Sequence, residues 1–215
     1  VEIQHGTAMQ ILRALAKRQD MHAYVLPGPK AGKSIGMFKK FPSAGDGLPD
    51  MVLLGAERNI ARFEVKNKAT APGKTVGYTV SITDKKVVKK TSSFKKLDLL
   101  GKEQAFKEEK NAGTYLLPPE LVDAVDLEAA VQAKTSAASY QFEAAGSLVT
   151  ECYGKALAPY RVVTAKGVNG RLSGDYVVIG VIHTLNRWSY KQDFKLLRNA
   201  RSAGAGGGSL LDKVL

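Results

Sequence analysis

Residues 159–200 read PYRVVTAKGVNGRLSGDYVVIGVIHTLNRWSYKQDFKLLRNA and predict three successive β-strands. The first contains the β-branched run at 162–164 and ends before the Asn-Gly pair at 169–170, which suits a tight turn. Residues 176–186 are apolar at both alternating sets of positions, which indicates a central strand buried on two sides. In residues 190–198 apolar and charged positions alternate, so this strand should expose one face to water.

The order of residues in this segment is also distinctive. It contains G-x-L-S-G-D-Y-V-V-x-G-V-I-H and then, after a short turn, Y-x-x-x-F-x-L-x-R-N-A. The residues that carry the pattern are Gly174, Tyr176, Val178, Val181, His183, Tyr190, Phe194, Leu196, Arg198 and Asn199. The pattern resembles the C-terminal end of the late control protein D family, the baseplate hub proteins of contractile phage tails. Relatives include the hub-like part of type VI secretion spike proteins.

Earlier segments resemble the same family. A helix after Thr7 with a following short strand is similar to the small unit that follows the family's first β-barrel, and Arg58-Asn59-Ile60 is similar to its "R-N-I" step. The family's "L-x-P-G" turn reads here as Leu157-Ala158-Pro159-Tyr160, so its usual Gly is replaced by Tyr160. The chain opens with Val1 rather than Met, and we expect it to be a C-terminal portion that lacks this first barrel.

The first forty residues predict a helix and a strand. Thr7 can cap a helix that ends near Gln19, and residues 23–26 form the expected strand. Residues 28–34, GPKAGKS, have three residues between the first Gly and Gly-Lys, where a phosphate-binding loop needs four. Because no helix pattern follows, we interpret them as a flexible basic loop.

The middle of the chain predicts a second β cluster and a basic arm. Strands are expected at 52–54, 61–66 and 75–83. Residues 85–110 hold nine lysines, among them three Lys-Lys pairs, and four acidic residues. With few apolar residues behind them, we expect a mobile or extended arm that is a preferred protease site. Phe94 and Phe106 are its only aromatic candidates for stacking on bases.

Residues 126–145 predict a helix, because acidic side chains at its start are followed by an Ala-rich stretch. Gly146 should end this helix. The strand that then begins at Leu148-Val149 is expected to pair with Val162-Val163.

The pattern of strands and short helices predicts an α+β protein. Together with the resemblance, which implies a hub-like β-barrel, we expect mainly an antiparallel β-barrel or sheet with short helices. The expected division is 1–84 for a small αβ unit and β segment, 85–118 for a Lys-rich arm or insertion, 119–202 for a helix with the C-terminal β-barrel portion, and 203–215 for a Gly-rich linker and tail. Charge is uneven along the chain. Residues 1–110 carry 21 basic and 11 acidic side chains, whereas residues 111–215 carry 11 and 9.

Catalytic and metal-binding patterns are missing from the sequence. His5, His22 and His183 stand in unrelated contexts, and we interpret His183 as a hydrogen-bonded core or interface residue. The single Cys152 cannot form an internal disulfide and is expected to be a packed thiol. We therefore expect no catalytic, cofactor or metal site. No apolar run is long enough to predict a membrane span.

The resemblance implies a structural baseplate hub that links the tail tube to the central spike of a contractile phage tail or injection particle. Such hubs are homotrimers, located in the virion tail and assembled in the bacterial cytoplasm. A polar face toward the tube lumen is then expected from Lys191, Asp193, Lys195, Thr75, Thr79 and Ser81. The alternative hypothesis is a nucleic-acid-binding module that uses the basic first half.

Overall fold

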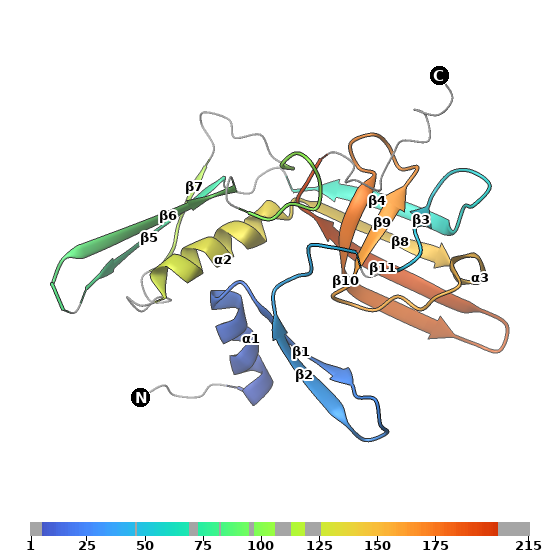
Figure 1. Ribbon diagram of the computed structural model, residues 1–215, viewed down its shortest axis with the longest axis horizontal. Coiled ribbons are helices and arrows are strands. Elements are labelled where there is room, and N and C mark those ends of the chain that lie inside the picture. Colours follow the sequence, from blue (N-terminus) through green and yellow to red (C-terminus); the bar gives the residue numbers. More distant parts are fainter. Residues whose placement is uncertain are drawn as a thin grey trace. The chain divides into compact units, whose positions relative to one another are not determined.

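The computed structural model describes residues 6–45, 47–68, 73–81, 83–94, 97–105, 113–118 and 126–201 (Figure 1). Contacts divide the chain into two compact units, each made of three stretches. Unit 1 comprises Val1–Phe41, Pro72–Leu97 and Lys110–Ala138, and unit 2 comprises Pro42–Ala71, Asp98–Glu109 and Ser139–Leu215. The fold is α+β with mostly antiparallel strands, as predicted. The units do not follow the four-part division expected along the chain, which stays a prediction.

Unit 2 is built on a curled six-stranded sheet. Its strands are β3 (Met51–Val52), β4 (Ile60–Asn67), β8 (Phe142–Val149), β9 (Val162–Lys166), β10 (Gly174–Leu185) and β11 (Tyr190–Arg198), and helix α3 (Thr150–Tyr153) follows β8. The strand order is β3-β9-β10-β11-β8-β4. Only the short β3–β9 pair is parallel in this sheet as described. Strands β3 and β4 therefore form its two edges.

One face of this sheet carries the core of unit 2. Its buried members include Met51, Ile60, Ala144, Leu148, Tyr153, Leu157, Val163, Tyr176, Val178, Phe194 and Leu196. The Phe63 ring meets Tyr176 edge-on at a centroid distance of 5.9 Å and contacts Phe194 at 6.0 Å. Every strand of the sheet contributes to this cluster, so packing in the core helps to hold the sheet in its curled shape.

The three C-terminal strands are confirmed, and β10 is an inner strand between β9 and β11. Its burial differs from the prediction. Tyr176, Val177 and Val178 are buried, whereas Ile182 and Leu185 are 65% and 74% exposed. The reason is length: β10 extends beyond β9, which pairs only with residues 174–177, so the far half has one strand neighbour.

The segment after helix α2 (Leu127–Ser139) was expected to stay helical to about residue 145, and this expectation is wrong. Residues 142–149 form β8, with Phe142, Ala144 and Leu148 buried at alternating positions. The expected pairing with Val162-Val163 is also wrong, because β8 pairs with β11 and β4. The helix propensity of alanine is overridden here because β8 pairs with strands on both sides and buries Phe142, Ala144 and Leu148 on the core face of the sheet.

Gly146 shows how tight that space is. A Cβ atom added there would lie 1.9 Å from the Arg62 carbonyl oxygen and 2.7 Å from the Phe194 ring. The prediction that Gly146 ends a helix is therefore wrong, because this residue lies inside β8. It permits the close approach of β4 and β11 across β8.

Tyr160 occupies the turn position where the resembled family has glycine. Its φ is 61°, in the left-handed region that disfavours side chains. The turn is nevertheless made, because the Tyr160 N–H donates to the Val178 carbonyl at 2.7 Å and the Val178 N–H donates to the Arg161 carbonyl at 2.8 Å. These two backbone bonds attach the turn to β10 and hold the unfavourable backbone conformation.

Unit 1 begins with helix α1 (Ala8–Arg18) and the hairpin of β1 (His22–Pro27) and β2 (Ser34–Lys39). Thr7 caps α1 as predicted, in a capping box where Gln10 N–H donates to Thr7 Oγ1 and Thr7 N–H donates to Gln10 Oε1. The basic loop at 28–33 connects the two strands, with Gly28 N–H donating to the Lys33 carbonyl at 2.8 Å. A strand follows instead of a helix, which agrees with the rejection of a phosphate-binding loop.

The rest of unit 1 packs a helix on a three-stranded sheet of order β6-β5-β7, made of β5 (Lys74–Val80), β6 (Val87–Ser93) and β7 (Thr114–Leu116). Helix α2 lies so close to β5 that a Cβ on Gly77 would meet Leu127 and Val131 at 2.7 and 2.8 Å. Thr75, on the same face as Gly77, is fully buried. Thr75 therefore cannot be one of the expected lumen-facing positions.

The Lys-rich segment is more structured than the sequence indicated. Residues 87–93 form β6, which pairs antiparallel with all of β5. Further on, residues 98–105 are fastened to the end of β11, since Asn199 Oδ1 accepts from Leu100 N–H at 2.9 Å and Nδ2 donates to the Asp98 carbonyl at 2.8 Å. The expectation that this segment is not packed is wrong for these described parts, because β6 pairs with β5 and the side chains of Phe94, Leu100 and Ala105 are buried.

A matched pair of substitutions tests the burial of β10. Val178→Asp should lower the free energy of unfolding by more than about 4 kcal/mol, because it places an unpaired charge in the core. Ile182→Asp should cost less than about 1 kcal/mol, since its site is solvent-exposed. Chemical denaturation of both variants measures this difference, and equal destabilisation would contradict the assigned burial.

Candidate functional site on the six-stranded sheet

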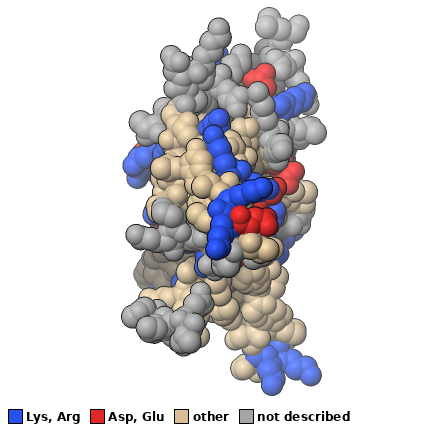
Figure 2. Space-filling view, turned by 90° about the vertical axis from the view of Figure 1, so that its left-hand side faces the viewer, with Lys and Arg blue, Asp and Glu red and all other residues tan. Residues whose placement is uncertain are grey.

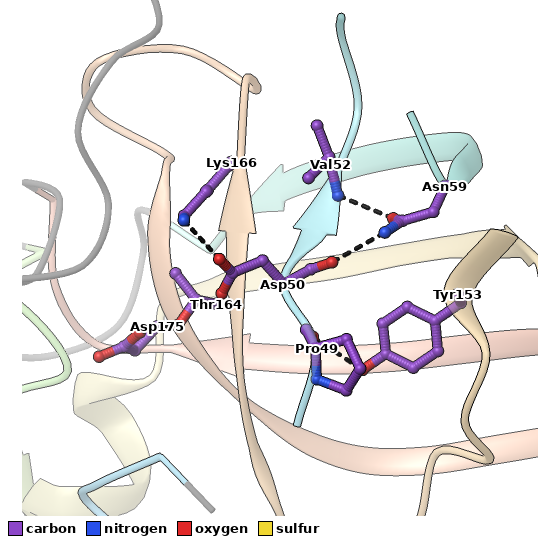
Figure 3. A network of polar contacts seen from close by, with 8 residues as sticks. All are labelled: Pro49, Asp50, Val52, Asn59, Tyr153, Thr164, Lys166 and Asp175. Carbon is purple, nitrogen blue, oxygen red and sulfur yellow. Dashed lines mark hydrogen bonds and ion pairs between the residues drawn. The ribbon is translucent and has the colours of Figure 1, made fainter. Parts of the chain in front are cut away.

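The two edge strands of unit 2 are joined by the side chain of Asn59, which directly precedes β4. Asn59 Oδ1 accepts from the Val52 N–H of β3 at 2.8 Å, and Asn59 N–H donates to the Val52 carbonyl at 2.9 Å. Asn59 Nδ2 donates to the Asp50 carbonyl at 2.8 Å (Figure 3). The amide group thus pairs with β3 as another strand would, and connects the ends of the strand order.

Further polar contacts hold the chain on either side of β3. Tyr153 of α3 donates its hydroxyl to the Pro49 carbonyl at 3.0 Å, and Lys166 at the end of β9 forms an ion pair with Asp50 (Figure 3). Burial raises the pKa of Tyr153 to about 12, with a smaller contribution in the same direction from Asp50. Because these side chains bond to backbone carbonyls and a counter-ion, the network stabilises the junction and presents no activated nucleophile.

The face of the sheet opposite the core carries an open groove of about 460 Å³. The register aligns two rows of side chains across β4, β8, β11 and β10: Arg62, Ser147, Asp193 and Ile182 in one, and Glu64, Ala145, Lys195 and Gly180 in the other. We call this the charged groove. Charged side chains on β4 and β11 alternate across the groove with small or apolar residues on β8 and β10.

The charges in the groove are arranged in pairs along single strands. Arg62 contacts Glu64 at 2.6 Å on β4, and Lys191 contacts Asp193 at 3.0 Å on β11. All four side chains are at least one-third exposed, so each pair contributes little stability and can be rearranged by a partner. The polar face expected from Lys191, Asp193 and Lys195 is thus present as a continuous surface with Arg62 and Glu64, which the sequence did not bring together.

The basic character of unit 1 is partly neutralised by its own residues. Lys90 forms an ion pair with Glu128 at 2.8 Å, while the Lys89 and Lys134 ammonium groups lie 5.5 and 4.6 Å from the ring centroids of Tyr78 and Tyr115. Figure 2 shows one face of the molecule, on which basic side chains are scattered among uncharged ones and, near the middle, lie beside acidic ones.

Phe94 and Phe106 were the aromatic residues expected to stack on nucleic-acid bases, and the structure gives this expectation little support. Phe94 is 2% exposed and cannot contact a base, and Phe106 lies outside the described residues.

Two of the histidines and the cysteine lie in the described part of the chain. His183 Nε2 lies 3.1 Å from the Leu157 carbonyl and Nδ1 lies 2.7 Å from the Tyr190 hydroxyl, so the ring is hydrogen-bonded as predicted, although it is exposed rather than in the core. The His22 ring stacks on Phe41, and burial together with Lys17 lowers its pKa. His5 lies outside the described residues. Cys152 is exposed, so the expected packed thiol is wrong.

Two negative findings concern the described part of the chain. No group of three or more His, Cys, Asp and Glu side chains there is arranged to hold a metal ion. None of the helices there has the length and apolar character needed to cross a membrane.

Comparison with known proteins shows the fold. No family model matches the chain, and no curated protein matches its sequence. Among solved structures, it is similar to the 43 kDa tail protein of prophage MuSo2 from Shewanella oneidensis, with a TM-score of 0.62 and 11% identity over 92% of this chain and 57% of that chain. It is also similar to a tail protein from Neisseria meningitidis MC58, with a TM-score of 0.56 and 13% identity over 92% of this chain and 56% of that chain. The chain therefore spans little more than half the length of these two proteins.

Tyr153 makes the junction sensitive to alkaline pH. Its hydroxyl ionises near pH 10 in the unfolded chain and near pH 12 in the folded one, so the stability it contributes is present below pH 10 and is lost as pH rises toward 12. Tyr153→Phe should cost about 1 kcal/mol at pH 8, from the lost hydrogen bond, and this cost should shrink between pH 10 and 12. Urea denaturation of both proteins across this range measures the difference, and a constant difference would contradict the assignment.

Proposed function

We propose that this chain is part of a structural baseplate hub that links the tail tube to the central spike of a contractile phage tail or injection particle. The observation that carries the proposal is the fold likeness to two tail proteins over 92% of the chain. A non-enzymatic role agrees with a junction whose polar side chains all serve to hold strands together.

The residues behind the resemblance to the late control D family support the proposal through their structural roles. Tyr176 donates its hydroxyl to the Leu172 carbonyl at 2.6 Å, and the buried Arg198 donates to the carbonyls of Leu172 and Ser173 at 2.9 and 2.7 Å. Asn199 fastens residues 98–105 to the sheet. These members of the pattern therefore act by holding the fold together.

In the proposed assembly the chain forms a homotrimeric ring in the virion tail, put together in the bacterial cytoplasm, with the tube protein and the spike protein as partners. A curled sheet with one apolar and one charged face suits a ring, because the core is enclosed within each copy and the charged face remains for a lumen or a neighbour. Each contact between copies should bury more than about 1,000 Å² to be stable.

The test is the mass in solution of the full-length protein, with purified tube and spike proteins. Light scattering should give a threefold mass and binding to at least one of the two partners. A protein that stays monomeric at high concentration and binds neither would contradict the proposal. A DNA-resin assay over a salt series runs in parallel, since steeply salt-dependent binding by such a monomer would favour the nucleic-acid-binding alternative.

A further inference from the structure

The β10–β11 hairpin ends in an exposed apolar tip. Trp188 is 85% exposed and Leu185 is 74% exposed, and both lie where the hairpin extends past β9. The Arg187 guanidinium lies 5.1 Å from the centroid of the Trp188 ring, which orients the two side chains together. We call residues 185–189 the Trp188 tip. Large aromatic groups so exposed at a projecting end are typical of contact sites for other proteins.

The turn that carries this tip is held in one conformation by Asn186. Its Oδ1 accepts from the N–H groups of Trp188 and Ser189 at 2.9 and 2.7 Å, and its own N–H donates to the Ser189 carbonyl at 3.0 Å. A turn fixed in this way loses little conformational entropy when it binds, so an anchor residue on it contributes more of its contact energy to affinity.

The charged groove of the same unit offers a matching recess. Gly180 has no side chain, and a Cβ added to it would meet no atom within 4 Å, so the groove is open on β10. Glu64 on β4 and Asp193 on β11 provide carboxylates, each held only by an exposed ion pair on its own strand. The groove can therefore take an apolar ring beside Gly180 and a guanidinium next to a carboxylate.

Resting on the proposed function, we propose that the Trp188 tip of one copy of this chain docks into the charged groove of the next copy. Trp188 is the anchor beside Gly180 on β10. Arg187 contacts Glu64 or Asp193, which are also paired with Arg62 and Lys191. Because the groove also holds Arg62, Lys191 and Lys195, the indole ring rather than charge carries most of the contact. Tip and groove are different surfaces, so the contact is head-to-tail and can close a ring.

Two substitutions test the contact from its two sides. Trp188→Ala removes the anchor, and Gly180→Phe fills the recess without a clash in the free chain. Sedimentation velocity of the 215-residue chain should show an oligomer for the wild type and a dissociation constant raised at least about 30-fold for each variant. Leu54→Ala, another exposed apolar residue of unit 2, and Gly36→Phe, an equally open glycine of unit 1, should leave it unchanged.

Mixing the two variants is the decisive experiment. Trp188→Ala keeps an intact groove and Gly180→Phe keeps an intact tip, so a 1:1 mixture should form a heterodimer although each variant alone is monomeric. Circular dichroism and thermal melting of each variant, matching those of the wild type, exclude misfolding as the cause of the loss.

Three results would overturn the inference. A wild-type chain that remains monomeric at millimolar concentration has no such contact. An oligomer whose mass is unaffected by Trp188→Ala or Gly180→Phe uses another surface, and in that case the hub proposal stands while this contact is rejected. A mixture of the two variants that stays monomeric shows that tip and groove do not meet each other.

Discussion

The curled sheet of unit 2 depends on one amide side chain at the meeting point of its edges. Strands β3 and β4 stand at opposite ends of the strand order, and each would leave backbone N–H and C=O groups without a strand partner. Asn59 satisfies β3 at Val52 with both its backbone N–H and its side-chain oxygen. The buried amide thus replaces a missing strand, and the core enclosed by the sheet requires it to stay paired.

From this closure follow the two different faces of the sheet. Once the edges meet, the apolar side chains of all six strands face one another, and the alternate positions of β4, β8, β11 and β10 are left for charged residues. β10 extends beyond β9, and its turn into β11 therefore lies away from the core. The charged face and this turn are the parts of the sheet that remain outside the core.

Much of this architecture could be predicted from local patterns. The period-two alternation of β11 and the Thr7 cap depend on neighbours in sequence, and both are present. The Asn-Gly pair lies instead within a longer connection, residues 167–173, and neither of its residues has a positive φ. β8 could not be predicted, because its alanines and Gly146 favour a helix or a turn when considered alone. The close contacts at Gly146, with the Arg62 carbonyl and the Phe194 ring, come from strands that are distant in sequence. The exposure of Ile182 depends on where β9 ends, and the role of Asn59 depends on the position of β3, a strand of two residues. Neither has a signal in the sequence around it.

Hydrogen exchange at Val52 tests the closure most directly. In the wild type its N–H donates to the buried side chain of Asn59, so its exchange should be as slow as that of the amides in β10. Asn59→Ala should bring Val52 to the exchange rate of a frayed edge and lower the free energy of unfolding by about 2 kcal/mol, whereas Leu54→Ala should change neither. Slow exchange at Val52 that persists in Asn59→Ala would contradict the account, because the edges would then be held together without the amide.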